Sequence, residues 1–138
     1  MCSVCDGKGR FLTAEDMSRE YPEWGALGWA SRPEDTGSKN LVVIEVKLAP
    51  GQGHDFHKHP NQEEIIYMID GQYEQWIRDK KQIIKSGDVA FIPKDTVHAG
   101  FNDFDKEVRL LAILGPAVGE AGYELEDVSE EEPWKSLR

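Results

Sequence analysis

Six short runs rich in β-branched and aromatic residues fill the middle of this 138-residue chain, and they constrain its fold more than any other feature. The runs are residues 41–48, 64–69, 73–77, 89–92, 97–101 and 108–114. Glycine, proline, asparagine or aspartate stands in nearly every gap between them. Short strands at regular spacing, separated by such turn residues, are typical of a β-sandwich or a β-barrel.

The two flanking segments differ from this middle region. Residues 1–40 carry scattered aromatics without sustained periodicity, and we expect them to wrap the barrel with a turn or two of helix. Residues 117–138 are strongly acidic, and residues 129–132, one serine and three glutamates, are not expected to bury anything. Because the chain is about one domain long, both flanks are predicted to extend the single domain formed by residues 41–116.

The net charge and the lack of long apolar runs limit the kinds of partner and the cellular location that we expect. The formal net charge is -10 and the sequence pI is about 4.8, so the chain repels phosphate backbones and general nucleic-acid binding is not expected. No apolar run approaches the roughly 18 residues of a membrane span, and no basic-then-apolar signal segment follows Met1. We therefore expect a cytoplasmic protein without a membrane partner.

The two cysteines, Cys2 and Cys5, both lie at the start of the chain, so a disulfide bond between them could not cross-link the rest of the fold. This placement fits a reducing compartment. Residues 2–9 resemble the repeated zinc-binding unit of the DnaJ-type chaperones, which need two such units per zinc, whereas this chain has one. A zinc site shared by two chains or a redox couple are the alternatives to the expected mobile terminus with two reduced thiols.

Two spaced groups of residues carry the chemistry of the middle region. In the first group, five residues separate Gly51 from His57-Lys58-His59, four residues separate His59 from Glu64, and six residues separate Glu64 from Gly71. In the second group, five residues separate Gly87 from Pro93 and one residue separates Pro93 from Asp95. Two residues then separate Asp95 from His98, and three separate His98 from Asn102. Together they resemble the two signature motifs of the cupin superfamily, whose members fold as small jelly-roll β-barrels. The only departure is Asp95, where cupins have glycine, and aspartate tolerates left-handed backbone better than most residues.

The resemblance implies an all-β fold, a single cupin jelly-roll barrel, and one divalent transition metal held by His57, His59, Glu64 and His98. The spacing agrees with this, because side chains two apart in a strand share a face and His57 and His59 then project together. Three imidazole nitrogens and one carboxylate suit Mn, Fe, Co, Ni, Cu or Zn, and the affinity order alone does not select one. The remaining histidine, His54, is expected to be a surface or core residue.

Glu63 competes with Glu64 as the carboxylate ligand, because adjacent strand residues face opposite sides. Glu64 fits the six-residue gap to Gly71, and it shares a face with Ile66 and Met68. We therefore predict that Glu64 points inward and that Glu63 lies at the surface or supports the site from outside.

Asp70-Gly71 has the composition of a two-residue hairpin turn. Pairing across such a turn places Met68 opposite Tyr73 and Ile66 opposite Gln75, with each pair on one face. The predicted pocket wall is therefore Ile66, Met68, Tyr73 and Gln75, with Phe91 and Phe101 as further apolar candidates.

Fold resemblance alone does not choose a function, because cupins include dioxygenases, isomerases, decarboxylases, sugar-binding regulatory domains and storage proteins. We expect a metal-dependent enzyme acting on a small organic substrate, with oxygenase (dioxygenase-like) chemistry first and isomerase or decarboxylase chemistry next. The alternative is a non-catalytic module that binds a small molecule, for example a sugar, with the metal as anchor. A storage or structural role is disfavoured, because the chain looks intracellular and lacks a second barrel.

Open strand edges and apolar side chains favour self-association. A short jelly roll leaves edges that need covering, and residues 11–30 carry more large apolar side chains than a free tail would tolerate. We therefore predict a homodimer, held by strand edges or by this segment rather than by the acidic tail.

Overall fold

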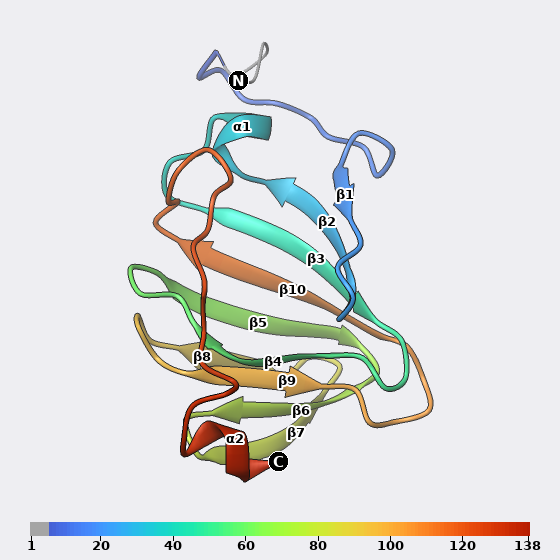
Figure 1. Ribbon diagram of the computed structural model, residues 1–138. Coiled ribbons are helices and arrows are strands. Elements are labelled where there is room, and N and C mark those ends of the chain that lie inside the picture. Colours follow the sequence, from blue (N-terminus) through green and yellow to red (C-terminus); the bar gives the residue numbers. More distant parts are fainter. Residues whose placement is uncertain (1–5) are drawn as a thin grey trace.

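The computed structural model describes residues 6–138 as two antiparallel β-sheets (Figure 1). The strands of the larger sheet, in spatial order from one edge to the other, are β1 (Ser18–Glu20), β2 (Ala26–Ser31), β3 (Val42–Leu48), β10 (Val108–Gly115), β5 (Glu63–Asp70) and β8 (Val89–Ile92). The smaller one consists of β11 (Glu126–Asp127), β4 (Gly53–Lys58), β9 (His98–Phe101), β6 (Gln72–Ile77) and β7 (Lys80–Lys85). The predicted all-β jelly roll is confirmed. The predictions for Cys2 and Cys5 lie outside the described residues.

Helix contributes little to this structure. Residues 6–138 contain two helices, α1 (Pro33–Thr36) and α2 (Trp134–Leu137), each about one turn long. Proline opens α1, acidic residues follow in its first turn, and a left-handed Gly37 ends it, which is the usual order of helix signals. Among the residues described, no helix has the length and apolar character needed to cross a bilayer.

The alternation of β5 sets which residues face the interior. Glu64, Ile66 and Met68 are buried, whereas Glu63, Ile65 and Tyr67 are exposed. Inward residues of β5 pack with inward residues of β2, β3 and β10 into one apolar core between the sheets. The predicted register, with Glu64 inward and Glu63 outward, is confirmed.

The predicted hairpin at Asp70-Gly71 is wrong. β5 pairs with β10 and β8, whereas β6 pairs with β7 and β9, so the chain passes from one sheet to the other at this point. Gly71 has a φ of 90°, and a Cβ there would lie 2.7 Å from the carbonyl oxygen of Glu107. Glycine is needed for this crossing rather than for a tight turn.

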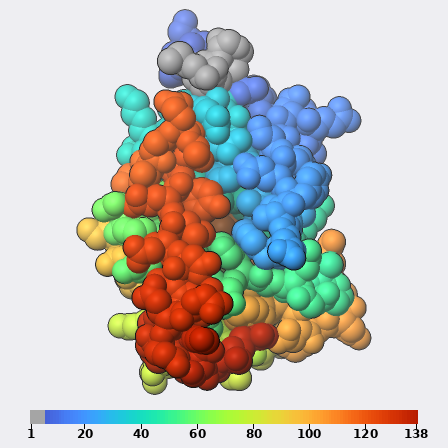
Figure 2. Space-filling view, in the orientation of Figure 1, coloured from blue at the N-terminus to red at the C-terminus, as the bar shows by residue number. Residues whose placement is uncertain are grey.

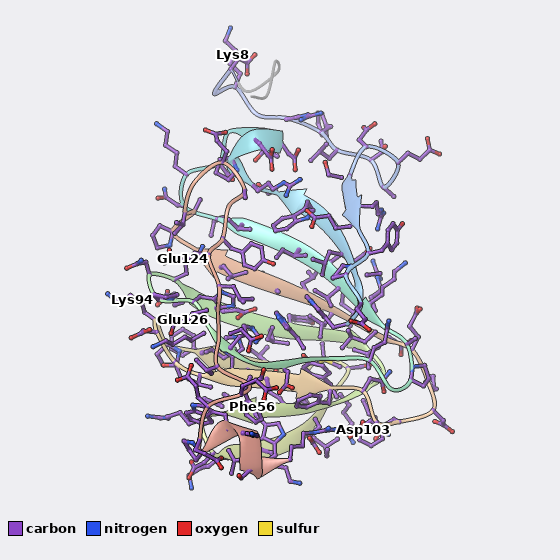
Figure 3. All side chains as sticks on the ribbon, viewed as in Figure 1. Lys8, Phe56, Lys94, Asp103, Glu124 and Glu126 are labelled. Carbon is purple, nitrogen blue, oxygen red and sulfur yellow. The ribbon has the colours of Figure 1, made fainter. Side chains whose placement is uncertain are left out.

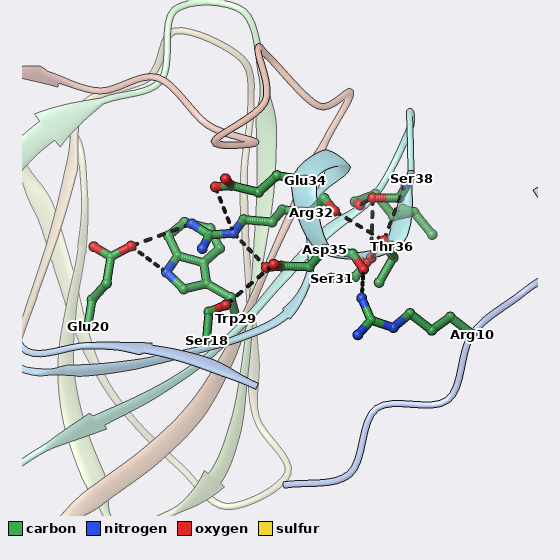
Figure 4. Close-up of polar contacts among 11 residues, drawn as sticks. Arg10, Ser18, Glu20, Trp29, Ser31, Arg32, Glu34, Asp35, Thr36 and Ser38 are labelled. Carbon is green, nitrogen blue, oxygen red and sulfur yellow. Dashed lines mark hydrogen bonds and ion pairs between the residues drawn. The ribbon is translucent and has the colours of Figure 1, made fainter. Parts of the chain in front are cut away.

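The later part of the N-terminal segment packs on its own barrel, whereas residues 6–16 are mostly exposed. β2 extends the larger sheet beside β3, and Leu27 and Trp29 are buried in the core. Arg32 follows β2 and forms ion pairs with Glu20, Glu34 and Asp35 (Figure 4). Its guanidinium carbon lies 4.2 Å from the centre of the Trp29 ring. Leu27 and Trp29 need no second chain to cover them, whereas Phe11 and Tyr21 are 98% and 75% exposed, and the homodimer stays a prediction.

The C-terminal extension runs down one face of the molecule as a continuous band (Figures 1 and 2). β11 adds to the edge of β4, and Val128 is buried. Further along, the Trp134 ring stacks on Phe56 with 5.7 Å between ring centres. The three glutamates of residues 130–132 are exposed, as predicted, but their neighbours in the extension are not free of the barrel.

Candidate metal centre

The structure brings the four predicted ligands together from three elements. His57 on β4 and His98 on β9 are directly paired across the smaller sheet, and His59 follows one residue after β4. Glu64 comes from β5 in the facing sheet. The exposed fractions of the four residues are between 3% and 6%, so the site lies between the two sheets and away from bulk solvent.

Each of the three imidazole rings is oriented by a backbone carbonyl. The Nδ1 atom of His57 lies 2.7 Å from the carbonyl oxygen of Asp55, and that of His98 lies 2.9 Å from the oxygen of Thr96. His59 Nδ1 lies 2.7 Å from the carbonyl oxygen of Glu124. A carbonyl oxygen can only accept, so Nδ1 carries the proton and Nε2 keeps its lone pair.

The three imidazole rings converge on one point, and the Glu64 carboxylate lies beside two of them. One ligand atom from each of the three histidines lies within 4.8 Å of the others. Glu64 Oε1 lies 2.8 Å from His98 Nε2 and 3.2 Å from His59 Nε2. Glu64 Oε1 and His98 Nε2 are buried, and neither makes a well-formed hydrogen bond with the residues described.

This convergence is the test of whether the residues fit a metal. A carboxylate oxygen and a deprotonated imidazole nitrogen at such distances repel one another unless a proton or a metal ion lies between them. Three imidazole nitrogens and one carboxylate oxygen are the ligands that first-row transition metals accept. The residues fit one divalent transition ion, and the donor set does not distinguish among the six metals considered above.

At Glu64 and His57, the direction of the pKa shift favours the form that binds metal. Burial alone would raise the pKa of Glu64, but the neighbouring His98 and His59 hold it well below its usual range. Burial lowers the pKa of His57, and the nearby histidines lower it further. For His59, burial alone would lower the pKa, but the negative charge of the adjacent Glu64 carboxylate outweighs burial and raises the pKa. An ionised carboxylate and a neutral imidazole are the forms that bind metal.

A cavity with about 50 Å³ of interior space surrounds the cluster. Of the six predicted wall residues, Ile66, Tyr73 and Gln75 line it. Tyr73 and Gln75 do so although the hairpin used to predict them is wrong, because β6 presents them to the interior from the opposite sheet. Gly100 makes room for Tyr73, since a Cβ there would lie 1.7 Å from the phenol oxygen.

Met68, Phe91 and Phe101 do not line the cavity. Met68 is fully buried in the apolar core, whereas Phe91 is 52% exposed because it pairs with the outward-facing Ile65. Phe101 packs against Phe56 in a separate cluster on the other side of the smaller sheet. Apolar character alone did not reveal which side of the strand each residue occupies.

His54 belongs to the cavity wall, contrary to its expected role. Its ring stacks between Trp24, at 3.9 Å, and His57, at 3.7 Å. Strand alternation would turn His54 and His57 to opposite faces, but the pairing of β4 with β9 shifts between them. This bulge inserts a residue and lets both side chains face inward. Burial lowers the pKa of His54 to about 3, so the ring is neutral.

Two aromatic wall residues come from the flanking segments. Trp24 precedes β2, and Tyr123 lies in the C-terminal extension. The Tyr123 ring lies 5.8 Å from the His59 ring. No sequence motif marks either residue, because both reach the cavity through the path of a segment that looks irregular.

Asp95 occupies the position where the second motif departs from the cupin pattern. Its φ is 60°, so the turn requires left-handed backbone and aspartate adopts it, as expected. Its carboxylate pairs with Lys58 at 3.2 Å, beside the two ligand histidines of the first motif.

The sequence profile of the cupin domain matches residues 44–114, which is just over half of the chain. The chain belongs to the cupin family. The matched residues include all four predicted ligands, whereas Trp24 and Tyr123 lie outside them.

Known cupin relatives match over different lengths. Protein SchB of Streptomyces halstedii is 28% identical over 113 residues, covering 82% of this chain and 82% of that protein. The pectin degradation protein KdgF of Dickeya dadantii is 33% identical over 76 residues, covering 54% of this chain and 69% of that protein. The structure of the polyketide cyclase RemF from Streptomyces resistomycificus superposes with a TM-score of 0.72 at 15% identity, covering 93% and 96% of the two chains. This last likeness shows a shared fold.

Proposed function

We propose that the protein is a metal-dependent enzyme acting on an uncharged, largely apolar organic substrate through two or more of the substrate's oxygen atoms. The observation that carries this proposal is a contrast within one cavity. Three imidazole nitrogens converge at one place beside the Glu64 carboxylate, whereas aliphatic and aromatic side chains form most of the remaining wall. Among the described residues, no lysine or arginine lines it.

His57, His59, His98 and Glu64 would hold the ion. When bound, a divalent metal supplies Lewis acidity that polarises a carbonyl or enol oxygen. Leu27, Ile44 and Leu110 keep the neighbouring wall apolar, which limits water beside the reacting atoms. The flat rings of Trp24 and Tyr123 offer surfaces for a planar substrate.

Two polar groups on β6 support a substrate that carries both hydroxyl and carbonyl oxygens. Gln75 Nε2 donates to the carbonyl oxygens of Trp76, at 3.0 Å, and Ala99, at 3.2 Å. These bonds fix the amide, and its own oxygen is buried without a partner among the described residues. Burial raises the pKa of Tyr73, so its hydroxyl stays protonated and can donate. A buried acceptor without a donor costs free energy that a substrate hydroxyl would recover.

The relatives favour different substrate classes. KdgF is named for the degradation of pectin, an acidic polysaccharide, and recognition of acidic sugars favours cationic side chains that this wall lacks. RemF is a polyketide cyclase, and polyketide chains are uncharged and carry many carbonyl groups. The apolar wall favours a polyketide-like substrate over an acidic sugar.

The reaction we propose is ring closure by intramolecular aldol addition. A proton leaves the carbon between two carbonyl groups, that carbon bonds to a further carbonyl carbon of the same molecule, and the new alkoxide takes up a proton. The ring product is an isomer of the substrate, and no oxidant is consumed. Oxygenase chemistry is the second candidate, because four protein ligands leave positions on a five- or six-coordinate ion for a substrate and O2.

Metal-loaded protein supplied with a linear 2,4,8-triketone, in which the carbon between the first two carbonyls can close a six-membered ring onto the third, tests the proposal in air and under nitrogen. We expect the same yield of ring product in both atmospheres, with a mass equal to that of the substrate or lower by one water. Oxygen consumption with incorporation into the product would favour the oxygenase instead. Tight binding of the triketone without turnover would favour a non-catalytic binding module. Protein carrying His57→Ala and His59→Ala is the control for uncatalysed cyclisation.

A further inference from the structure

The three ligand histidines differ in where their orienting carbonyls come from. The carbonyls that receive the Nδ1 protons of His57 and His98 belong to residues two positions upstream on the same chain segment. The carbonyl that receives the Nδ1 proton of His59 belongs to Glu124, 65 residues away. Glu124 lies beyond residues 44–114, which match the cupin domain.

Residues 116–128, called the strap from here on, place this carbonyl. Figure 3 labels Glu124 and Glu126 where the strap crosses the barrel. Below Glu124, β11 pairs with β4, bringing Glu126 opposite Lys58 and Asp127 opposite His57. Above it, the backbone of Ala117 donates to the carbonyl oxygen of Lys39 at 3.0 Å. The strap is therefore fastened at both ends.

Gln62 fastens the strap next to Glu124 itself. Its side-chain Nε2 donates to the carbonyl oxygens of Pro116, at 2.8 Å, and Gly122, at 2.9 Å. Its Oε1 accepts from the backbone N–H of Glu124 at 3.2 Å. The exposed fraction of Gln62 is 1%, so these groups have no water to replace a lost partner.

We infer that the strap is the outer part of the metal centre and that Gln62 is its positioning residue, which sets the orientation of His59 through the Glu124 carbonyl. The inference rests on the proposed role of His59 as a metal ligand. A ring rotated about its Cβ–Cγ bond would turn its Nε2 lone pair away from the ion. Loss of an orienting partner of this kind typically weakens metal affinity about 10- to 100-fold.

The chain contains a matched control for Gln62. Asn102 is also a fully buried amide with three hydrogen bonds to backbone groups of distant or looped segments. Its Nδ2 donates to the carbonyl oxygens of Leu48 and Lys106, and its Oδ1 accepts from the N–H of Phe104. Asn102 does not line the cavity and contacts no part of the strap through these bonds. Its loss should cost stability without disturbing His59.

The experiment compares Gln62→Met with Asn102→Leu in the full chain. Each variant and the wild type is titrated with Co²⁺, whose visible absorption reports the ligands around the ion, and the thermal unfolding of the metal-free forms is recorded. We expect both variants to lose stability, but only Gln62→Met to bind Co²⁺ about 10- to 100-fold more weakly, with an altered spectrum. Equal Co²⁺ affinities in the two variants would overturn the inference. Failure of the wild type to bind Co²⁺ would instead overturn the proposed function.

A measurement on the wild type covers the case in which Gln62→Met does not fold. Nitrogen-15 NMR of the histidine rings in the metal-free full chain reports which ring nitrogen carries the proton. The inference requires a neutral His59 to carry it on Nδ1, with slow exchange against solvent. A His59 ring protonated on Nε2, or an Nδ1 proton that exchanges as fast as that of a surface histidine, would contradict it.

Discussion

The smaller sheet and the strap hold metal ligands in different ways. In β4 and β9, His57 and His98 are paired with each other and oriented by carbonyls of their own strands. His59 follows the end of β4, where the strand no longer constrains it, and depends on a carbonyl from the C-terminal extension. Two candidate ligands are therefore fixed by strands within the matched cupin domain, whereas the third depends on a segment outside it.

The largest expected effect comes from removing ligands from both regions at once. His57→Ala combined with His59→Ala should abolish metal loading, because a single carboxylate and one imidazole bind a divalent ion weakly. Elemental analysis should find close to one transition-metal ion per wild-type chain and none in the double variant. His54→Ala is the control, since His54 stacks on His57 without joining the converging cluster, and it should keep the metal. Full occupancy in the double variant would contradict the site.

Glu64 connects the two kinds of support, because its carboxylate approaches both His59 and His98. Glu64→Gln removes the only anionic ligand and should weaken Co²⁺ binding by at least about tenfold, the lower limit for loss of a supporting group. Glu63→Gln changes the same charge on the exposed face of β5 and should leave the affinity unchanged. A larger effect from Glu63→Gln would mean that the ligand comes from the wrong face of the strand.

The local supports should tolerate side-chain changes that the strap does not. Asp55→Ala and Thr96→Ala keep the backbone carbonyls that orient His57 and His98, so we expect changes in Co²⁺ affinity of about twofold or less. The 10- to 100-fold effect expected for Gln62→Met stands against these two controls. If Asp55→Ala weakened binding as much as Gln62→Met, the distinction between local and distant support would fail.

The same distinction explains what the sequence could predict. The four candidate ligands could be named from the sequence because they match the motifs that resemble those of cupins, and strand alternation agrees with that resemblance. The carbonyl of Glu124 could not be predicted, since every residue has one and only the path of the strap brings it to His59. His54 was assigned wrongly for a related reason, because a bulge in the pairing of β4 with β9 reverses the alternation.

Errors in topology had smaller consequences than errors in local geometry. The hairpin between β5 and β6 does not exist, yet Tyr73 and Gln75 still line the cavity. Both strands alternate, so an inward face remains inward whichever strand lies beside it. Phe91 was placed inside because it is apolar, although its neighbours Ala90 and Ile92 are the buried residues of β8. Alternation within β8 would have predicted which of its residues face inward better than apolar character did.

The smallest expected effect concerns the far end of the extension, beyond the strap. Arg138 pairs with Glu74 at 2.7 Å and also contacts Asp103. Burial alone would raise the pKa of Glu74, but its bonds to Arg138 and Trp76 lower it below the ordinary value of 4.5. The folded state therefore binds this proton less readily than the unfolded chain, so the contribution to stability is present above about pH 4.5 and is lost as the pH falls below it.

Arg138→Ala should reduce the free energy of unfolding at pH 7 by about 0.5 kcal/mol, because solvent screens this pair. Urea unfolding of the wild type and the variant at pH 7 and in acid checks the sign, since the difference should shrink as Glu74 is protonated. Lys135→Ala removes an exposed positive charge from the same turn and serves as the control. Co²⁺ affinity should not change in either variant, because β11 and Gln62 fasten the strap before the chain reaches this end. A weaker Co²⁺ affinity in Arg138→Ala would show that His59 depends on the whole extension and not on the strap alone.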